Sequence, residues 1–556
     1  MRQYIFAFIT ILSLLCSSLI PHTVTAMNKD HIKKLVLNGH KLKTIQNIQT
    51  LKSKKKHSKN LTSLAENINS NPVNYTGQIN DTKTVEYVFK VATASTIQVT
   101  ANHESSVIDY ALVGTDSDGN LSYYSDGDTL PPGDYSFYVL SYSPSTVEYS
   151  YELSNVTFYT QPDNHLPGIV LTNPSFPMNR LPANTTNIVF SGSTDTQTQL
   201  SSNQTFYKSF AGDFTINVPL HLGHNFIDLQ SVSPTGNAVY MHFDPVVPGL
   251  KRIGGANRYE VSANISREMP DSTTVIIASG ETFPDALSGG SISGLFNAPV
   301  LLTQSAELSS NVIQELQRRK PEKAIILGGT GSVSGNVERK LSNLGVQQIE
   351  RIDGPNRFAV SAGIAKKLFD LLGAETSDTA IITNGIIFSD ALSASSISSK
   401  ALIPTLLVTN TSLPTEINQF LQDHPQIKNF IIVGGTGSVS NDIAYQLTRL
   451  GGNVSRIDGQ NRYQVNVNLA NYFAMDPGFL VFANGTNFPD ALSGGPFASS
   501  LASVPTPLLL TPANQLDANV QSYLNTNKNS INVIYILGGT GSVSSYVESQ
   551  VNEYIH

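Results

Sequence analysis

The sequence predicts a multidomain protein in which two N-terminal antiparallel β-sandwich modules precede three Rossmann-like α/β repeats with parallel sheets. Residues 75–247 alternate apolar and polar side chains between Gly, Pro and Asp turns, which is typical of antiparallel strands. From residue 248 on, short apolar runs alternate with helical stretches, which predicts parallel sheets covered by helices on both faces. Three motifs recur there three times in the same order, so this part consists of three repeats.

The first residues of the 556-residue chain are typical of a secretory signal peptide, which we place at residues 1–26. Arg2 precedes an apolar run from Tyr4 to Ile20, and Val24-Thr25-Ala26 offers small residues for cleavage. No later segment approaches the roughly 20 apolar residues of a membrane span. We therefore expect a secreted protein without a transmembrane segment.

The only cysteine, Cys16, lies inside the predicted signal peptide. It could mark a lipidation site, but the bulky Leu15 before it favours an ordinary signal residue. The mature chain therefore has no thiolate for a disulfide or a metal site.

Residues 27–74 are expected to form a basic, partly helical linker. Residues 27–60 hold ten lysines and one aspartate, although the whole chain has a formal net charge of −7. The rest of the mature chain is therefore strongly acidic. The linker is either attracted to an anionic surface or is a solvated spacer.

The first β module is placed at residues 75–159. Its clearest strand is 84–91, in which Val85, Tyr87, Phe89 and Val91 share one face. This pattern resembles the small β-sandwich found beside secreted bacterial peptidases, the pre-peptidase C-terminal type. Residues 116–120, Asp-Ser-Asp-Gly-Asn, lack the later glutamate of an EF-hand loop, so we interpret them as a hairpin turn.

The second β module is placed at residues 160–247 and looks like an immunoglobulin-like spacer of bacterial surface proteins. Its clearest strands are 187–192, 212–218 and 224–229. His221 and His224 are three residues apart, which puts them on opposite faces of a strand. We therefore expect loop and edge residues here and no metal site in either module.

The three repeats are placed at residues 248–350, 351–452 and 453–556. In the first repeat, the apolar runs predict strands at 274–278, 299–303, 323–327 and 347–352. Helices are expected between them at 257–269, 286–296, 311–319 and 335–344.

The recurring motifs are an arginine motif, an aspartate motif and a glycine run. Arg252-Ile253-x-Gly-x-Asn257-Arg258-Tyr259 returns, with small changes, from Arg351 and from Arg456. Phe-Pro-Asp-Ala-Leu-Ser at 283–288 returns at 388–393 and 488–493, and Gly-Gly-Thr-Gly-Ser-Val-Ser is identical at 328–334, 434–440 and 538–544. Repetition favours multivalent binding, because linked weak sites gain avidity.

Ligands of open parallel sheets bind beyond the carboxyl ends of the strands. The aspartate motif follows the first strand of each repeat, a threonine ends the second, and the glycine run follows the third. We therefore expect these elements to converge on one edge. The candidate binding residues are Asn257, Arg258, Asp285, Ser288, Thr303, Asn356, Arg357, Asp390, Ser393, Thr409, Asn461, Arg462, Asp490, Ser493 and Thr511.

The glycine run has two interpretations. A strand, a glycine loop and a helix N-terminus can cradle a phosphate, but Ser334 stands where a dinucleotide fingerprint needs its last glycine. The favoured interpretation is a tight turn in which Ser334, Ser440 or Ser544 caps the next helix.

The aspartates and arginines also have two interpretations. Asp285, Asp390 and Asp490 are expected at helix starts, where a carboxylate meets the positive end of the helix dipole. The arginines of the arginine motif either pair with these aspartates or with backbone carbonyls, or they recognise an anion.

Catalysis in the repeats is not expected. Only His424 and His556 lie beyond residue 247, and no acid–base pair recurs.

The three ordered motifs together resemble the type 2 cell wall binding repeat of Gram-positive bacteria, over residues 251–556. The resemblance implies a noncovalent anchor to anionic polymers attached to peptidoglycan, such as teichoic acid or a secondary polysaccharide. It also implies that the repeats pack as a pseudo-threefold trimer. Family members often carry an amidase or protease domain. The second repeat departs from the pattern at Phe358, Ser389, Ala394 and Val433.

The leading hypothesis is therefore a secreted, cell-wall-associated binding protein whose β modules serve display or partner binding. We expect no cofactor and no nucleic-acid partner. The alternatives are a modifier or tether of a wall hydrolase, and a wall hydrolase with its site in residues 61–247. Because the chain is acidic, local arginines, backbone amides or a bridging cation must attract an anionic polymer.

Overall fold

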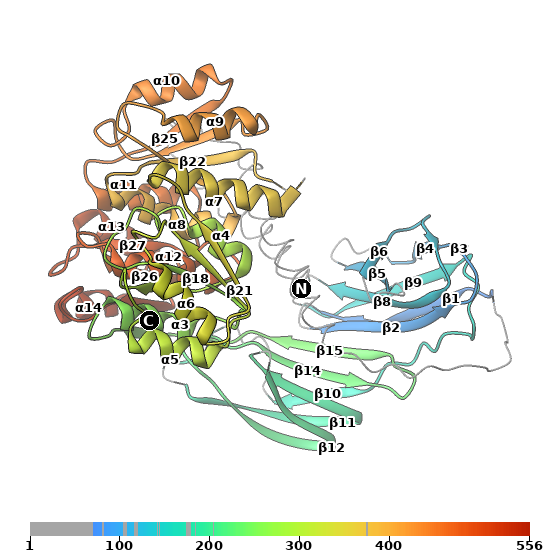
Figure 1. Cartoon of the computed structure of the whole chain (residues 1–556). Helices are drawn as coiled ribbons and strands as arrows, with labels where there is room; N and C mark the ends of the chain where they lie inside the picture. Colours follow the sequence, from blue (N-terminus) through green and yellow to red (C-terminus); the bar gives the residue numbers. More distant parts are fainter. Residues whose placement is uncertain are drawn as a thin grey trace. The chain divides into compact units, whose positions relative to one another are not determined.

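The computed structural model describes residues 70–556, apart from 81–82, 104–107, 116–120, 142, 144, 174–179, 184, 204, 374–375 and 556. The predicted signal peptide, most of the basic linker and the predicted turn at 116–120 lie outside the described residues. The chain forms two compact units, one ending at Val247 and one beginning at Pro248 (Figure 1).

The first unit is built from antiparallel strands. A three-stranded sheet has the order β1-β9-β4, and a nine-stranded sheet has the order β10-β11-β14-β15-β2-β8-β5-β6, with β12 paired to β11. The short pairs β3 with β7 and β13 with β16 complete it. The strands are β1 Val73–Ile79, β2 Lys83–Val91, β3 Ser95–Thr96, β4 Gln98–Ala101, β5 Ile108–Thr115, β6 Leu121–Tyr124, β7 Thr129–Leu130, β8 Gly133–Ser141, β9 Val147–Ser154, β10 Ile169–Asn173, β11 Asn187–Ser202, β12 Thr205–Pro219, β13 Gly223–His224, β14 Ile227–Val232, β15 Ala238–Phe243 and β16 Val246–Val247.

The nine-stranded sheet joins the two predicted β modules. β15 pairs antiparallel with β2, and Ala238 stands opposite Glu86. Val239 packs into the same hydrophobic cluster as Tyr87. The two modules therefore share a sheet and part of a core, which period-two alternation cannot reveal because it does not specify strand partners.

The strand at 84–91 has the predicted inward face: Val85, Tyr87, Phe89 and Val91 are all buried. Glu86, on the opposite face, is also buried. It accepts hydrogen bonds from Ser136 Oγ at 2.7 Å, Tyr138 OH at 2.8 Å and Tyr240 OH at 2.5 Å. Three hydroxyl donors compensate the loss of water around a carboxylate.

The second unit consists of three α/β repeats, as predicted, each with a four-stranded parallel sheet. The sheet orders are β19-β18-β20-β21, β23-β22-β24-β25 and β17-β28-β26-β27. The strands are β17 Gly249–Ile253, β18 Thr274–Ser279, β19 Val300–Thr303, β20 Lys323–Leu327, β21 Gln348–Ile352, β22 Thr379–Asn384, β23 Thr405–Val408, β24 Asn429–Val433, β25 Asn453–Ile457, β26 Phe479–Asn484, β27 Leu508–Thr511 and β28 Val533–Leu537.

The helices follow the predicted pattern. They are α3 Arg258–Glu268, α4 Gly290–Phe296, α5 Ser310–Arg319, α6 Gly335–Asn343, α7 Arg357–Leu372, α8 Phe388–Ala401, α9 Thr415–Asp423, α10 Asn441–Arg449, α11 Arg462–Tyr472, α12 Pro489–Ser500, α13 Ala518–Asn527 and α14 Ser545–Asn552. The helix expected from residue 286 begins only at Gly290, because Ala286 and Gly289 form i→i+3 turns instead. Helix ends commonly shift in this way.

The third sheet takes its fourth strand from the other end of the unit. β17, which precedes the first repeat, pairs parallel with β28 from Gly249↔Val533 to Ile253↔Leu537. In the first two sheets the fourth strand, β21 or β25, leads directly into the next repeat. The strand β17 therefore closes the three repeats into a ring.

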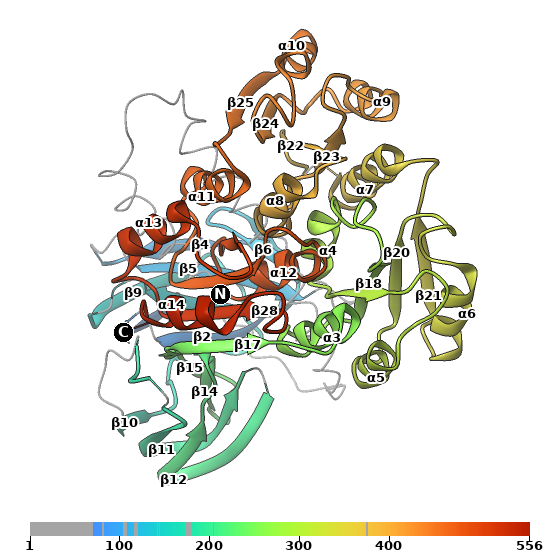
Figure 2. The ribbon, with the colours of Figure 1, turned by 90° about the vertical axis from the view of Figure 1, so that its left-hand side faces the viewer.

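The ring is held together at its centre by α4, α8 and α12, which lie side by side (Figure 2). A Cβ atom on Gly294 of α4 would lie 2.6 Å from the carbonyl carbon of Ser399 in α8. Only glycine allows the two helix backbones to approach this closely. The hydroxyls of Ser399 and Ser499, from α8 and α12, are 2.7 Å apart.

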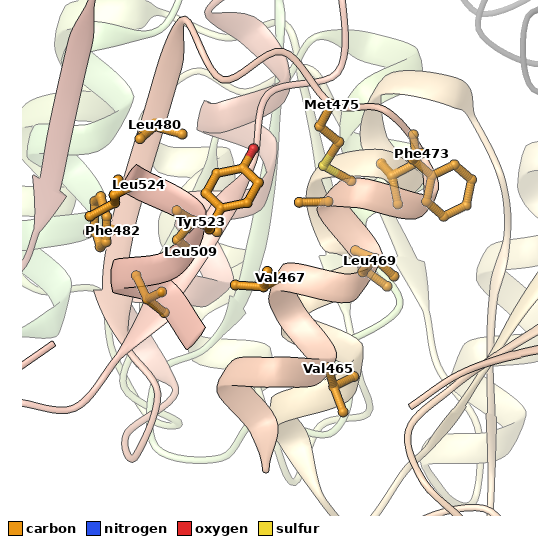
Figure 3. Packing of buried hydrophobic residues seen from close by; sticks show 14 of the residues in the cluster. Val465, Val467, Leu469, Phe473, Met475, Leu480, Phe482, Leu509, Tyr523 and Leu524 are labelled. Atoms are coloured by element: carbon orange, nitrogen blue, oxygen red, sulfur yellow. The ribbon is translucent and has the colours of Figure 1, made fainter. Parts of the chain in front are cut away.

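The repeats also share a hydrophobic core. One cluster contains Ile397 of α8 together with Phe482 of β26 and Val467 of α11. Figure 3 shows the part of this cluster where Val467 of α11 points toward Leu509 of β27 and Tyr523 of α13. A repeat separated from its neighbours would expose apolar surface, so the unit is expected to unfold as one body.

Candidate functional site

The aspartate motif and the glycine run of each repeat contact each other. Gly328, directly after β20, has φ +101°, and a Cβ there would lie 2.9 Å from Asp285 Cγ. Ser332 Oγ of the same run donates to Asp285 Oδ2 at 2.6 Å. The first glycine is therefore required both by its left-handed backbone and by the aspartate packed against it.

The same arrangement recurs in the other two repeats. Ser438 Oγ donates to Asp390 Oδ2 at 2.6 Å, and Ser542 Oγ donates to Asp490 Oδ2 at 2.7 Å. Gly434 and Gly538 have φ +118° and +97°. The repeated sequence thus folds into a repeated geometry.

The first arginine of the arginine motif braces the glycine run. Arg351 Nη1 donates to the carbonyls of Gly328 at 2.8 Å and Val333 at 2.9 Å. Arg456 does the same at Gly434. Arg252, on the ring-closing strand β17, donates to Gly538 O at 3.0 Å in the third repeat.

The asparagine of the motif is a helix cap. The Oδ1 of Asn257 accepts from the backbone N–H groups of Tyr259 at 3.1 Å and Glu260 at 3.0 Å. Asn356 and Asn461 cap α7 and α11 in the same way. The three asparagines are exposed at the edge predicted for binding. The Nδ2 groups of Asn356 and Asn461 donate to Glu416 at 2.7 Å and to Asp517 at 3.4 Å.

The second arginine of the motif links consecutive repeats. Arg357 Nη1 donates to Gly385 O at 2.6 Å in its own repeat, so the backbone-carbonyl alternative is the one that the structure has. Its guanidinium also lies over the ring of Phe283 in the preceding repeat, 5.8 Å from the centroid. Arg462 lies over Phe388 and Arg258 over Phe488, both at 5.6 Å.

The three phenylalanines meet one another at the centre of the ring. The centroid of Phe283 is 5.4 Å from those of Phe388 and Phe488, and the latter two are 6.0 Å apart, all in edge-on geometry. This threefold contact, surrounded by three arginines, confirms the predicted pseudo-threefold packing.

A cleft lies where the second and third repeats meet. Its volume is about 680 Å³, and its walls come from the aspartate motif and glycine run of the second repeat and the arginine motif of the third. All of these segments follow the carboxyl ends of strands. The predicted convergence is confirmed for the aspartate motif and the glycine run, whereas Thr409, at the end of the second strand, is not among the lining residues. The lining residues are Ser389, Asp390, Gly435, Thr436, Gly437, Ser438, Asp458, Gly459, Gln460, Asn461, Arg462, Gln464, Val465 and Asn468.

The electrostatics of the cleft centre on a buried carboxylate. Burial raises the pKa of Asp390, while the Ser438 hydrogen bond and the Arg462 charge oppose that rise. Burial likewise raises the pKa of Asp490, against Ser542 and against Arg258 of the first repeat. The pKa of each of these two aspartates is therefore lowered by the charge of the arginine in the following repeat of the ring.

Several predicted binding residues lie inside the protein. Ser288, Ser393, Ser493, Thr303 and Thr511 are buried. Most of their hydroxyls donate to backbone carbonyls; Ser493 Oγ, for example, donates to Val300 O of the first repeat at 2.9 Å. A polymer cannot reach these side chains in this structure, whereas Thr409 is half-buried. The position of these residues at or beyond the strand ends predicted the course of the backbone but not the direction of the side chains.

Other lining residues were not among the predicted ones. The glycine run was interpreted as a structural turn, but Gly435, Thr436 and Gly437 form one wall of the cleft. Their identical recurrence in three copies was the available signal. The capping prediction is confirmed for Ser440 and Ser544, whose Oγ atoms accept from helix N–H groups, whereas Ser334 Oγ donates to Ala306 O.

The repeats match the sequence profile of cell wall binding domain 2 at residues 252–338, 351–444 and 456–548. The three α/β repeats belong to this family. They are repeats of the CWB2 type. The described helices include none that is long and apolar enough to cross a membrane, and among the described residues no group of three or more His, Cys, Asp or Glu side chains could hold a metal ion.

Two curated proteins of Bacillus subtilis (strain 168) are similar to the chain. It is 32% identical over 303 residues to the N-acetylmuramoyl-L-alanine amidase LytC, covering 54% of this chain and 58% of LytC. It is 31% identical over 346 residues to the amidase enhancer, covering 62% of this chain and 45% of the enhancer. The chain thus spans about half the length of the curated relatives that it matches.

Among solved structures, Cwp6 from Clostridium difficile has a similar fold. The TM-score is 0.54 at 19% sequence identity, covering 70% of this chain and 68% of Cwp6. At this identity the likeness concerns the fold alone.

Proposed function

We propose that the chain is a secreted protein held noncovalently at the cell wall, and that the contacts between its CWB2 domains bind an anionic secondary wall polymer. Teichoic acids and acidic polysaccharides are the expected ligands. The observation that carries this proposal is the cleft of about 680 Å³ between the second and third repeats. Its walls combine an exposed asparagine amide and an arginine of one repeat with the glycine run of the other.

Equivalent residues stand at all three contacts of the ring. The cation–π pairs Arg357–Phe283, Arg462–Phe388 and Arg258–Phe488 place each arginine motif against the preceding repeat in the ring. A long polymer with many anionic groups can engage several such sites at once. Even weak individual sites then give strong retention, because the second and third contacts form intramolecularly.

The test is sedimentation of the full-length mature chain with purified cell walls, before and after chemical removal of the secondary polymers. We expect the chain to sediment with complete walls and to stay in solution with stripped ones. Arg462→Gln should weaken retention, whereas Arg339→Gln, at an exposed position of α6, should not. Equal retention on complete and stripped walls would contradict an anionic polymer as the ligand.

The role of the β unit, and its resemblance to the pre-peptidase type, remain hypotheses. The similarity to an amidase and to an amidase enhancer supports one further candidate, in which the chain tethers or stimulates a wall hydrolase. Co-sedimentation of an amidase with the full-length chain would support it. Zymography on a wall substrate tests the remaining alternative, because clear lysis would show a hydrolase site of the chain's own.

A further inference from the structure

The second and third glycines of the glycine run, Gly329 and Gly331, have no structural reason to be glycine. Only the first, Gly328, has a left-handed backbone, and Gly329 and Gly331 do not. A Cβ on Gly329 or Gly331 would meet no atom within 4 Å. Yet Gly-Gly-Thr-Gly is identical in all three repeats.

The corresponding glycines of the other repeats are similarly open. A Cβ on Gly437 or Gly541 would meet nothing within 4 Å, and on Gly435 or Gly539 it would be 4.0 or 3.6 Å from the nearest carbonyl oxygen, ordinary van der Waals contact. Glycine without a conformational or packing requirement is typical of places where a ligand approaches the backbone.

Three successive backbone N–H groups of this loop donate none of the hydrogen bonds found in the described part of the chain. Gly328 N–H donates to Ile352 O at 2.9 Å, and the N–H groups of Ser332 and Val333 both donate to Gly329 O at 3.0 Å. Between them, the described hydrogen bonds include none donated by the N–H groups of Gly329, Thr330 or Gly331. Thr330 and Gly331 are exposed.

The loop that carries these N–H groups is fixed from behind. Arg351 holds the carbonyls of Gly328 and Val333. Ser305 Oγ donates to Gly331 O at 2.9 Å, and in the second repeat Asn410 Nδ2 donates to Gly437 O at 2.6 Å. These carbonyls are therefore occupied by the protein, while successive N–H groups are left for a ligand. Such a row of N–H groups attracts anions although the donors carry no formal charge.

We propose that the Gly-Gly-Thr-Gly loop of each repeat is the anion-binding element of the cleft, and that its backbone N–H groups bind the phosphate or carboxylate oxygens of the wall polymer. This inference rests on the proposed function. It explains how a cleft that contains Asp390 and Asp458 beside a single arginine, Arg462, holds an anionic ligand. Neutral amide donors supply the attraction that the side-chain charges lack.

The test places methyl groups over the loop without disturbing the fold. In the full-length chain, Gly331→Ala, Gly437→Ala and Gly541→Ala are combined, because a Cβ at each position enters open space. The matched control combines Thr330→Ser, Thr436→Ser and Thr540→Ser, which changes the same loops but covers no N–H group. Retention on walls and the melting temperature are measured for both.

We expect the alanine variant to melt like the wild type and to lose retention by about tenfold or more, since hydrogen bonds to charged groups are strong. The serine control should bind like the wild type. Competition by a soluble glycerol phosphate oligomer and by a uronic acid oligomer then identifies the anionic group. Retention of the alanine variant at the wild-type level would overturn the loop as the anion site while leaving wall binding intact.

A second variant covers the case in which the methyl groups lower the melting temperature. Thr436 is the second residue of a turn closed by the hydrogen bond from Ser438 N–H to Gly435 O, a position that proline favours. Thr436→Pro, combined with Thr330→Pro and Thr540→Pro, removes one N–H group per loop without adding bulk to the glycines. Reduced retention supports the proposal and unchanged retention overturns it. Failure of the wild type to bind walls at all would instead contradict the proposed function.

Discussion

The close approach of α4 and α8 predicts a large effect of one methyl group. In Gly294→Ala, the new Cβ would lie 2.6 Å from the carbonyl carbon and 2.9 Å from the Cα of Ser399, where carbon atoms normally keep about 3.5–4.0 Å. The obstacle is backbone, so it cannot rotate away and the helices must separate by about 1 Å. One turn earlier, Gly290 would then lose its contact with Ser395, whose carbonyl oxygen is 2.8 Å from the corresponding Cβ position.

Overpacking of a core costs about 1–3 kcal/mol and occasionally more, and we expect the upper end here because three helices share the contact. The matched control is Gly335→Ala at the first position of α6, where a Cβ meets nothing within 4 Å. That change should be neutral or stabilising by about 0.5–1 kcal/mol.

The assay is thermal unfolding of the full-length chain, followed by circular dichroism in the helical region, since the helices of the described residues lie in the repeats. At about 2–3 °C per kcal/mol for a unit of this size, Gly294→Ala should melt about 6–9 °C below the wild type. Gly335→Ala should melt at or slightly above it. If both variants melted together, the reasoning about the helix contact at the ring centre would be refuted.

Two further predictions concern the aspartate motif and the glycine run. Burial raises the folded pKa values of Asp390 and Asp490, so these groups destabilise the fold as the pH rises from the ordinary carboxyl pKa through the raised values. Combining Asp390→Asn with Asp490→Asn should remove that part of the pH dependence of the melting temperature. The same pH dependence of the melting temperature in wild type and variant across the acidic range would contradict this prediction. Arg351→Lys keeps the charge, but a lysine cannot bind two carbonyls and Glu338 at once. The variant should therefore lower the free energy of unfolding by about 1.5–3 kcal/mol, measured by urea denaturation. An unchanged denaturation midpoint would show that the guanidinium group is not needed.

The elements of the repeats were predictable because each is short and bounded. The apolar runs at 274–278 and 323–327 became β18 and β20, and alternation placed Val85 and Tyr87 in the core. The contacts of Arg357 with Phe283 and of β17 with β28 were not, because nothing local specifies a partner in another repeat. Asp390 and Asp490 lie in the first turns of α8 and α12, as predicted, but the hydrogen bond between Asp390 and Ser438 of the glycine run was not predicted.

The ring-closing strand also sets the copy number of this architecture. β17 precedes the first repeat and completes the sheet of the last one. The ring therefore closes at the pairing of β17 with β28, and the first and last repeats must have matching orientations for these strands to pair. Three repeats, each related to the next by the same rotation, bring these two strands together. Duplication or loss of a single repeat would prevent β17 from pairing and leave an unpaired sheet edge on β28. We therefore expect proteins of this architecture to gain or lose repeats in sets of three.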